Sequence, residues 1–127
     1  MHEYAIAQEL VAQVERIARE HGAEAVTRVI VQVGRLRAVV PDILRWGFEV
    51  AAAHTLAEGA ALVIEEIPIV IRCRTCDAES RLDDPVFICP RCGGFDVEPI
   101  SGDELILKSL EIDGERNPSR SEYPAGQ

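Results

Sequence analysis

The sequence lacks an apolar run long enough to cross a membrane, because its apolar runs are interrupted within about ten residues and a spanning helix needs about 20. It also lacks, at its N-terminus, the basic, apolar and small-residue regions of a signal peptide. Basic residues are few, with 13 Lys and Arg against 22 Asp and Glu, for a formal charge of −9. Nucleic-acid binding depends largely on neutralising phosphates with basic side chains. We therefore expect a cytoplasmic protein that binds neither membranes nor nucleic acids.

The residue arrangements that most enzymes use for catalysis are also missing from the sequence. No nucleophile stands beside a base, no glycine-rich loop is suited to phosphate, and the three histidines form no cluster. We therefore expect that the protein is not an enzyme. Cysteine is absent outside residues 73–92, where all four cysteines occur. In a reducing cytosol, cysteines grouped in this way are metal ligands more often than disulfide partners.

The 127 residues are enough for one domain with a small satellite module. Apolar residues at intervals of three and four predict an amphipathic helix over residues 4–20, and a β-branched run predicts a strand over 25–33. Pro41 suits the first turn of a second helix. Pro68, within the strand region ALVIEEIPIVIRC, indicates an edge position or a bulge. A third strand is predicted in DELILKSLEID, after the cysteines.

These elements predict an α+β protein, with a small three-stranded sheet, two helices on one face, and an inserted four-cysteine zinc-ribbon module. The α+β domain would take residues 1–70 and 100–113, and the zinc-binding domain would take residues 71–99. Residues 114–127 contain polar, Gly and Pro residues without periodicity, which predicts a disordered tail.

The four cysteines form two Cys-x-x-Cys pairs, Cys73 with Cys76 and Cys89 with Cys92, separated by twelve residues. Two residues between thiolates let one tight turn direct both sulfurs at one ion, so two such turns supply the four ligands of a closed tetrahedral site. Structural sites of this kind mostly hold zinc. The alternatives are two disulfides, which suit a cytosolic chain poorly, and a thioredoxin-like redox motif, which normally uses one pair on a βαβ scaffold.

The chain begins MHEY, which places a histidine beside the free amine of Met1. The amine, the following amide nitrogen and the His2 imidazole can close adjacent chelate rings on one ion. Ni(II) and Cu(II) favour such nitrogen-rich, square-planar settings. Glu3 adds an oxygen ligand or a hydrogen-bond acceptor. A histidine near a terminus is by itself usually an unstructured residue, so this pattern acquires meaning only in combination with others.

In combination, the patterns resemble the HypA/HybF family of nickel-insertion proteins for hydrogenase maturation. The resemblance rests on MHEYAIAQEL, the strand end VQVGRL, PDILRWGFE, the paired cysteines and SGDELILKSLEID, and it covers residues 1–113. It implies a nickel-binding α+β domain with a projecting zinc domain. Nickel ligands would then be the amine of Met1, the imidazole and backbone nitrogen of His2, and the backbone nitrogen of Glu3. The implied zinc ligands are Cys73, Cys76, Cys89 and Cys92.

The same resemblance implies a metallochaperone that binds Ni(II) at its N-terminus and delivers it during the maturation of nickel–iron hydrogenase. The implied partners are a HypB-type nickel-handling GTPase and the large subunit of the hydrogenase, and a homodimer stays open. One position departs from the family pattern. Many members carry a carboxylate six residues after the glycine that ends the first strand, where this chain has Val40, and Asp42 follows two residues later.

The main alternative is a zinc-ribbon module that docks a protein or a nucleic acid without handling nickel. Such a module needs a basic or aromatic surface around its cysteines. The arginines of this segment are offset by at least as many acidic residues, and Phe87 and Phe95 are its only aromatic residues. The composition therefore favours the metallochaperone.

Overall fold

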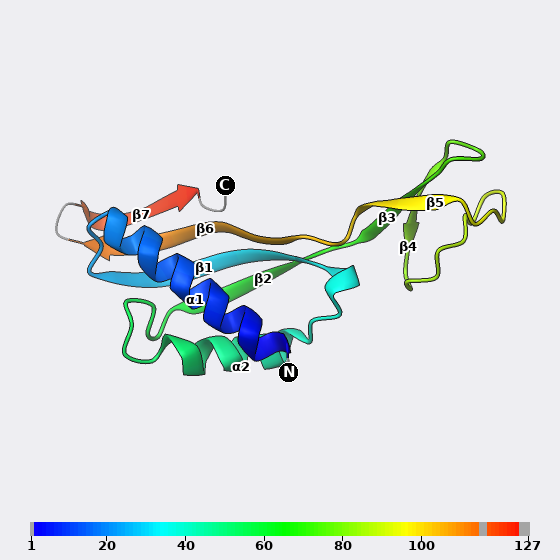
Figure 1. The fold of residues 1–127 in the computed structure, drawn as a ribbon. Helices are drawn as coiled ribbons and strands as arrows, with labels where there is room; N and C mark the ends of the chain where they lie inside the picture. The colour runs from blue at the N-terminus through cyan, green and yellow to red at the C-terminus, as the bar shows by residue number, and fades with distance from the viewer. Residues whose placement is uncertain (1, 115–116, 125–127) are drawn as a thin grey trace. The chain divides into compact units, whose positions relative to one another are not determined.

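The structure is a computed structural model that describes residues 2–114 and 117–124, with side chains described for residues 2–114 (Figure 1). Along the chain the elements are α1 (His2–Glu20), β1 (Ala25–Gly34), the 3-10 turn η1 (Arg35–Arg37), α2 (Pro41–Ala52), β2 (Ala61–Ile67), β3 (Ile69–Cys73), β4 (Glu79–Leu82), β5 (Val97–Ser101), β6 (Leu105–Gly114) and β7 (Asn117–Pro124). The strands form two sheets, of order β2-β1-β6-β7 and β4-β3-β5. No helix among the described residues is long and apolar enough to span a membrane.

The described residues form two compact units. The first consists of residues from Met1–Val31, Val39–Glu65 and Ile106–Gln127, and the second of Gln32–Ala38 and Glu66–Leu105. The second unit takes in more of the chain than the residues 71–99 that the sequence assigns to a zinc-binding domain. The additional residues are 32–38, 66–70 and 100–105, which include the end of β1, the turn η1 and the segments on either side of the predicted domain.

In the first unit, α1 lies across the sheet and α2 packs against α1 (Figure 1). The helices approach closely at Gly47, where an added Cβ would lie 3.4 Å from the Cβ of Ala7. The core contains apolar residues from both helices and from β1 and β6. These residues recur every three or four positions in the helices and mostly every second position in the strands, which places them on the inner faces. The fully buried members include Leu44, Phe48, Val14, Val29, Leu107 and Ile112.

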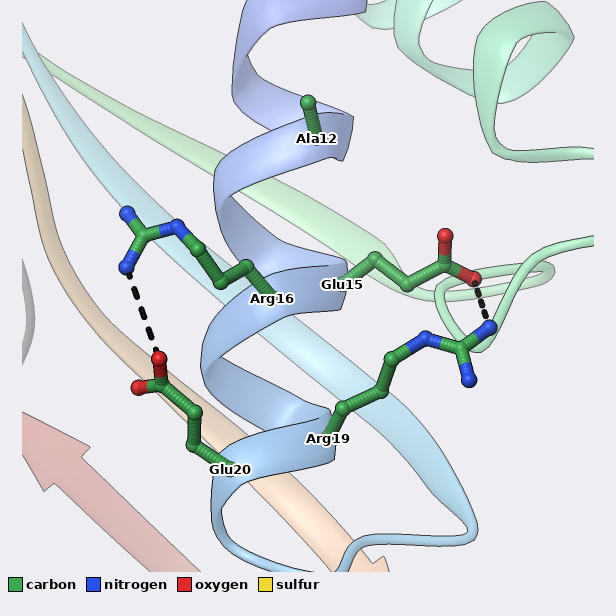
Figure 2. Close-up of a pocket in the computed structure, with 5 residues that line it drawn as sticks. All are labelled: Ala12, Glu15, Arg16, Arg19 and Glu20. Carbon is green, nitrogen blue, oxygen red and sulfur yellow. Dashed lines mark ion pairs between the residues drawn. The ribbon is translucent and has the colours of Figure 1, made fainter.

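The outer side of α1 carries charged residues that pair with one another along the helix (Figure 2). Arg16 lies 3.8 Å from Glu20, and Arg19 lies 3.5 Å from Glu15. These are the i,i+4 pairs that stabilise exposed helix faces by a few tenths of a kcal/mol. Glu15 has a second contact, since its carboxylate also accepts the backbone N–H of Leu56 at 3.1 Å. The side chains line a shallow hollow whose charges are already paired.

In the second unit, β3 is the central strand and pairs antiparallel with β4 and β5. Ile69, Ile71 and Leu82 are buried together, with Leu36 and Val97 packed partly against them. The strand that was predicted to run through Pro68 is divided there into β2 and β3, which belong to different sheets. Proline has no N–H to donate to a ladder, and the residue that suggested an edge position or a bulge stands directly after the edge strand β2, where the chain changes sheet.

The turn before η1 depends on the contact between two glycines. A Cβ on Gly34 would overlap the carbonyl group of Gly102 and lie 2.5 Å from the backbone nitrogen of Asp103. This close approach lets Gly34 donate its N–H to the carbonyl of Glu104 at 2.7 Å. It also lets Leu36 donate its N–H to the carbonyl of Gly102 at 2.7 Å. Gly102 has a φ of +111°, which few other residues adopt.

The predicted α+β class, with two helices and a sheet, is confirmed. The three predicted strands are present as β1, β2 and β6, and the sheet has a fourth strand, β7, at its edge. This strand lies within residues 114–127, which were predicted to be a disordered tail. It pairs antiparallel with β6, with Leu110 opposite Tyr123. Residues 115–116 and 125–127 of the predicted tail lie outside the described residues.

Candidate metal sites

The two Cys-x-x-Cys pairs adopt the same turn. In each pair, the N–H of the first cysteine donates to the carbonyl five residues later at 2.9 Å. The carbonyl of the first cysteine accepts the N–H four residues later at 2.8 Å. That fourth residue is left-handed in both turns, with φ of +63° at Asp77 and +75° at Gly93. Two copies of one tight turn therefore present their thiols in equivalent ways.

The four thiols that the sequence predicted to act together are brought into one cluster. Their sulfur atoms all lie within 4.8 Å of one another, and the Cys73–Cys92 and Cys76–Cys89 distances are 3.6 Å. A tetrahedral ion with Zn–S bonds of about 2.3 Å requires sulfur–sulfur distances of about 3.8 Å. The first cysteine of each pair is buried and the second is exposed. The cluster therefore has the spacing of a closed four-thiolate metal site.

Backbone N–H groups within each turn favour ionisation of the first cysteine. The N–H of Cys76 lowers the pKa of Cys73 to about 6. The N–H of Cys92 in the same way lowers the pKa of Cys89. At Cys92 the N–H of Gly94 lowers the pKa, but the neighbouring sulfurs, that of Cys73 first, together with partial desolvation outweigh it and raise this pKa to about 12. Four thiolates this close together repel one another, so the set ionises fully only around a divalent cation. The donor set fits a thiolate-bound ion such as zinc.

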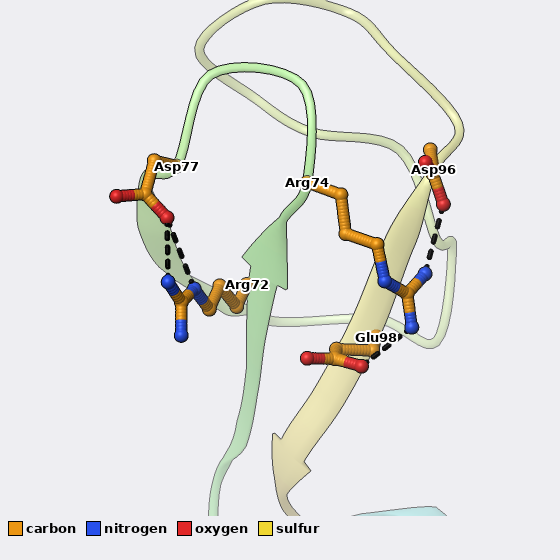
Figure 3. A network of polar contacts seen from close by, with 5 residues as sticks. All are labelled: Arg72, Arg74, Asp77, Asp96 and Glu98. Atoms are coloured by element: carbon orange, nitrogen blue, oxygen red, sulfur yellow. Dashed lines mark hydrogen bonds and ion pairs between the residues drawn. The ribbon is translucent and has the colours of Figure 1, made fainter.

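Ion pairs surround the first turn (Figure 3). The sequence predicted only that the charges of this segment offset one another, and it gave no sign that Glu98 takes part. The guanidinium of Arg72 contacts one carboxylate oxygen of Asp77 at 2.7 and 3.1 Å. Arg74 contacts Asp96 at 2.8 Å and also reaches Glu98 on β5. Arg74 and Asp96 are also joined through their backbones, because the Arg74 N–H donates to the Asp96 carbonyl at 2.9 Å. These ion pairs neutralise the charges of arginines that a nucleic-acid-binding ribbon would leave unpaired.

At the other candidate site, His2 and Glu3 form the first turn of α1, while Met1 lies outside the described residues. The His2 side chain is exposed, and its Nδ1 lies 3.7 Å from the Glu3 carboxylate. Glu3 is buried, which is unusual for a charged residue. Its carboxylate accepts the N–H of Val40 at 3.1 Å. This hydrogen bond, followed by the contact with its own N–H, lowers the pKa of Glu3 below the usual 4.5.

The Glu3–Val40 hydrogen bond explains how the first turn of α1 is held. Val40 is the N-cap of α2, whose carbonyl accepts the Leu44 N–H at 3.0 Å. The Glu3 carboxylate thus connects the start of α1 to the start of α2. The Asp42 carboxylate instead contacts Arg45 at 3.0 Å and is almost fully exposed. Sequence reasoning had no signal for the role of Val40, because the group that bonds Glu3 is its backbone.

Together, the fold and the thiol cluster define a small α+β protein of two units, one of which carries a four-cysteine metal site. Residues 1–112 match the family model described as "Hydrogenase/urease nickel incorporation, metallochaperone, hypA". The chain therefore belongs to the HypA family, and the resemblance found in the sequence is confirmed.

Relatives and solved structures agree with this assignment. The hydrogenase maturation factor HypA of Aquifex aeolicus is 39% identical over 113 residues, covering 89% of this chain and 98% of the relative. The factor of the same name from Nostoc punctiforme is 43% identical over 114 residues, covering 89% of this chain and 96% of the relative. The solution structure of the Ni metallochaperone HypA from Helicobacter pylori superposes with a TM-score of 0.63 at 26% identity, covering 89% of this chain and 98% of that one.

Proposed function

We propose that this chain is a nickel metallochaperone that binds Ni(II) through Met1, His2 and Glu3 and delivers it during the maturation of nickel–iron hydrogenase. The family assignment supports nickel handling in hydrogenase maturation. The observation that supports the site in this chain is the position of His2 and Glu3 in the first turn of a helix, directly after Met1 in the sequence.

Backbone nitrogens at this position are suited to bind a metal. The N–H groups of the first four residues of a helix have no acceptor in the helical ladder, so those of His2 and Glu3 can lose their protons without breaking it. The Glu3 N–H would then give up its contact with the Glu3 carboxylate. The positive end of the helix dipole stabilises negative charge there, which favours a deprotonated amide. Two such nitrogens, the amine and the imidazole would form the planar four-nitrogen set that Ni(II) prefers.

We assign the Glu3 carboxylate a positioning role. It is buried and accepts the Val40 N–H, so it holds the helix start in place rather than pointing freely at an ion. Val40 occupies the position where many family members have a carboxylate, and its side chain offers no ligand. The proposed site therefore consists of nitrogen ligands, supported by one anchored carboxylate.

The second unit would hold zinc at Cys73, Cys76, Cys89 and Cys92. A four-thiolate site has no open coordination position, so its ion stabilises the fold and takes no part in catalysis. Accordingly, we propose that the first unit handles nickel, that the second is the zinc-binding unit, and that the protein is a cytoplasmic maturation factor rather than an enzyme.

Delivery requires a site that releases its ion. The exposed His2 imidazole, at the chain terminus, can be reached directly by the ligands of an acceptor. We propose that the acceptors are a HypB-type nickel-handling GTPase and the large subunit of the hydrogenase. No catalysis by this chain is needed, because the metal passes from one set of ligands to the next.

A transfer assay tests this function. The zinc-loaded chain would be given one equivalent of Ni(II), mixed with the metal-free GTPase, and separated from it, and nickel in each fraction would be measured by mass spectrometry. The native chain should transfer nickel, and His2→Gln should carry none. His21→Gln is the matched control, because His21 lies just beyond the other end of α1 and contacts the Ile17 carbonyl at 2.9 Å. Equal transfer by the native chain and His2→Gln would contradict the proposed site.

A further inference from the structure

The α2 helix has an exposed apolar side that its packing does not explain. Val40, Ile43, Trp46 and Val50 are 47%, 39%, 59% and 44% exposed, respectively. We call these four residues the α2 apolar face. Trp46 is the only tryptophan of the chain and is the most exposed member of the face.

The α2 apolar face is separate from the side of α2 that forms the core. Residues at intervals of three and four lie on one side of a helix, which groups Ile43, Trp46 and Val50. The core side is already complete, since Leu44, Gly47, Phe48 and Ala52 are the buried residues of α2. A third side carries the polar residues, including Asp42 and Arg45. An apolar surface bordered by polar residues is typical of a binding site.

The solvent side of α1 provides a contrast within the same unit. It is charged, and its charges are paired with one another (Figure 2). A helix that only covers the core needs no more than this. The need to keep the outer side of a helix soluble therefore explains the charges on α1, but it does not explain the exposed apolar residues on α2.

The α2 apolar face is contiguous with the proposed nickel site. Its first member, Val40, donates its N–H to the carboxylate of Glu3, next to His2. Further along α2, Gly47 lies against Tyr4 and Ala7, so that α2 stays beside the first two turns of α1. A protein that brings its own ligands to His2 therefore comes within reach of this face.

The size and the surroundings of the face indicate what kind of partner covers it. Four side chains with these exposures offer roughly 350 Å², whereas a stable dimer buries about 800 Å² on each subunit. By itself, the face covers less than half of the area that each subunit of a stable dimer buries, so it suits an anchor for a transient complex better than a permanent contact with a second copy. Tryptophan is one of the residue types enriched among such anchors. At the border of the face, Asp42 is already paired with Arg45 at 3.0 Å, so the feature that a partner must match is the apolar surface itself, with a complementary apolar pocket.

We propose that the α2 apolar face is the docking surface for the nickel-accepting GTPase, with Trp46 inserted in an apolar pocket of that protein. This inference depends on the proposed function, because it assumes that the acceptor takes nickel from the N-terminus. Docking through α2 would orient the acceptor's ligands beside His2, so that the ion passes directly from protein to protein.

The test uses the purified, metal-free GTPase of the HypB type from the source organism as the probe. The chain labelled with 5-fluorotryptophan has one fluorine signal, from Trp46, which should shift when the GTPase is added. Trp46→Gln and Ile43→Gln should each weaken binding about tenfold or more, as removal of an anchor residue does. Ile106→Gln is the matched control, because Ile106 is 39% exposed in the same unit, as is Ile43, but lies on β6. It should bind like the wild type.

The outcomes separate this proposal from its alternatives. Equal binding by all variants, or no binding by the wild type, would overturn it. Concentration-dependent self-association that Trp46→Gln abolishes, measured by sedimentation without the GTPase, would show that a second copy occupies the face and would also overturn it. Nickel titration of Trp46→Gln should match that of the wild type. If the wild type bound no nickel at its N-terminus, the proposed function would fail, whatever the result for docking.

Discussion

Replacing one buried thiolate should unfold the second unit and leave the first folded. In Cys89→Ser the metal would lose a buried ligand that lies 3.6 Å from the Cys76 sulfur. The apolar core of this unit contains three buried side chains, each contributing about 2 kcal/mol. A structural zinc ion contributes about 10–16 kcal/mol. The metal is therefore the larger contribution, and the small core cannot replace it.

Amide hydrogen exchange, read residue by residue, is the assay for this prediction. Cys89→Ser should lose protection in β4 and β5, whereas α1 and α2 should keep theirs, because the first unit has its own buried core. Treating the wild type with a strong zinc chelator should have the same effect. Thr75→Ala is the control, since it changes a residue of the same turn and keeps all four thiols. A Cys89→Ser protein with full metal content and a protected β4 would refute the reasoning.

Three further predictions concern single residues. Gly34→Ala should lower the free energy of unfolding by about 3 kcal/mol or more, because the added Cβ would overlap the Gly102 carbonyl. Urea titration measures this loss, and a value below about 1 kcal/mol would contradict the prediction. Gly93→Ala should weaken metal binding about tenfold, measured by chelator competition. The cause is the φ of +75°, which is unfavourable for a residue with a side chain, since no atom lies within 4 Å of the added Cβ. Unchanged affinity would contradict the importance of the turn geometry. The hydrogen bond from Val40 to Glu3 should persist at neutral pH and be lost as the pH falls below about 4.5 and through the lowered pKa of Glu3, because a lowered pKa means that the fold stabilises the ionised carboxylate. The Val40 amide shift would be followed by NMR against pH, with Glu3→Gln as the control, and a shift with no such transition would disprove the prediction.

Much of the fold and of one candidate site could be predicted because the relevant signals are local. The intervals of apolar residues in α1, and Pro41 at the first position of α2, are properties of short segments. The cysteine spacing is similarly informative, since a Cys-x-x-Cys turn needs only a few neighbouring residues to direct its two sulfurs. The structure shows these two turns to be equivalent, down to the left-handed residue that follows each pair.

The features that were missed depend on residues far apart in the sequence. Strand β7 carries no apolar alternation, and its hydrogen bonds come from β6, so its own residues do not predict it. The change of sheet at Pro68 depends on which strands flank β2 and β3. The anchoring of Glu3 depends on a backbone N–H 37 residues away. Contacts of this kind become visible only when the chain is folded.

The central claim is that nickel binds at the chain terminus, and a calorimetric nickel titration tests it most directly. The zinc-loaded protein with its native N-terminus would be compared with a matched protein carrying one extra glycine before Met1. The extra residue moves the free amine away from His2 and leaves all side chains unchanged. The native protein should bind about one equivalent of nickel, and the extended protein should bind it far more weakly. Equal binding by the two proteins, or no binding by either, would contradict the proposed site.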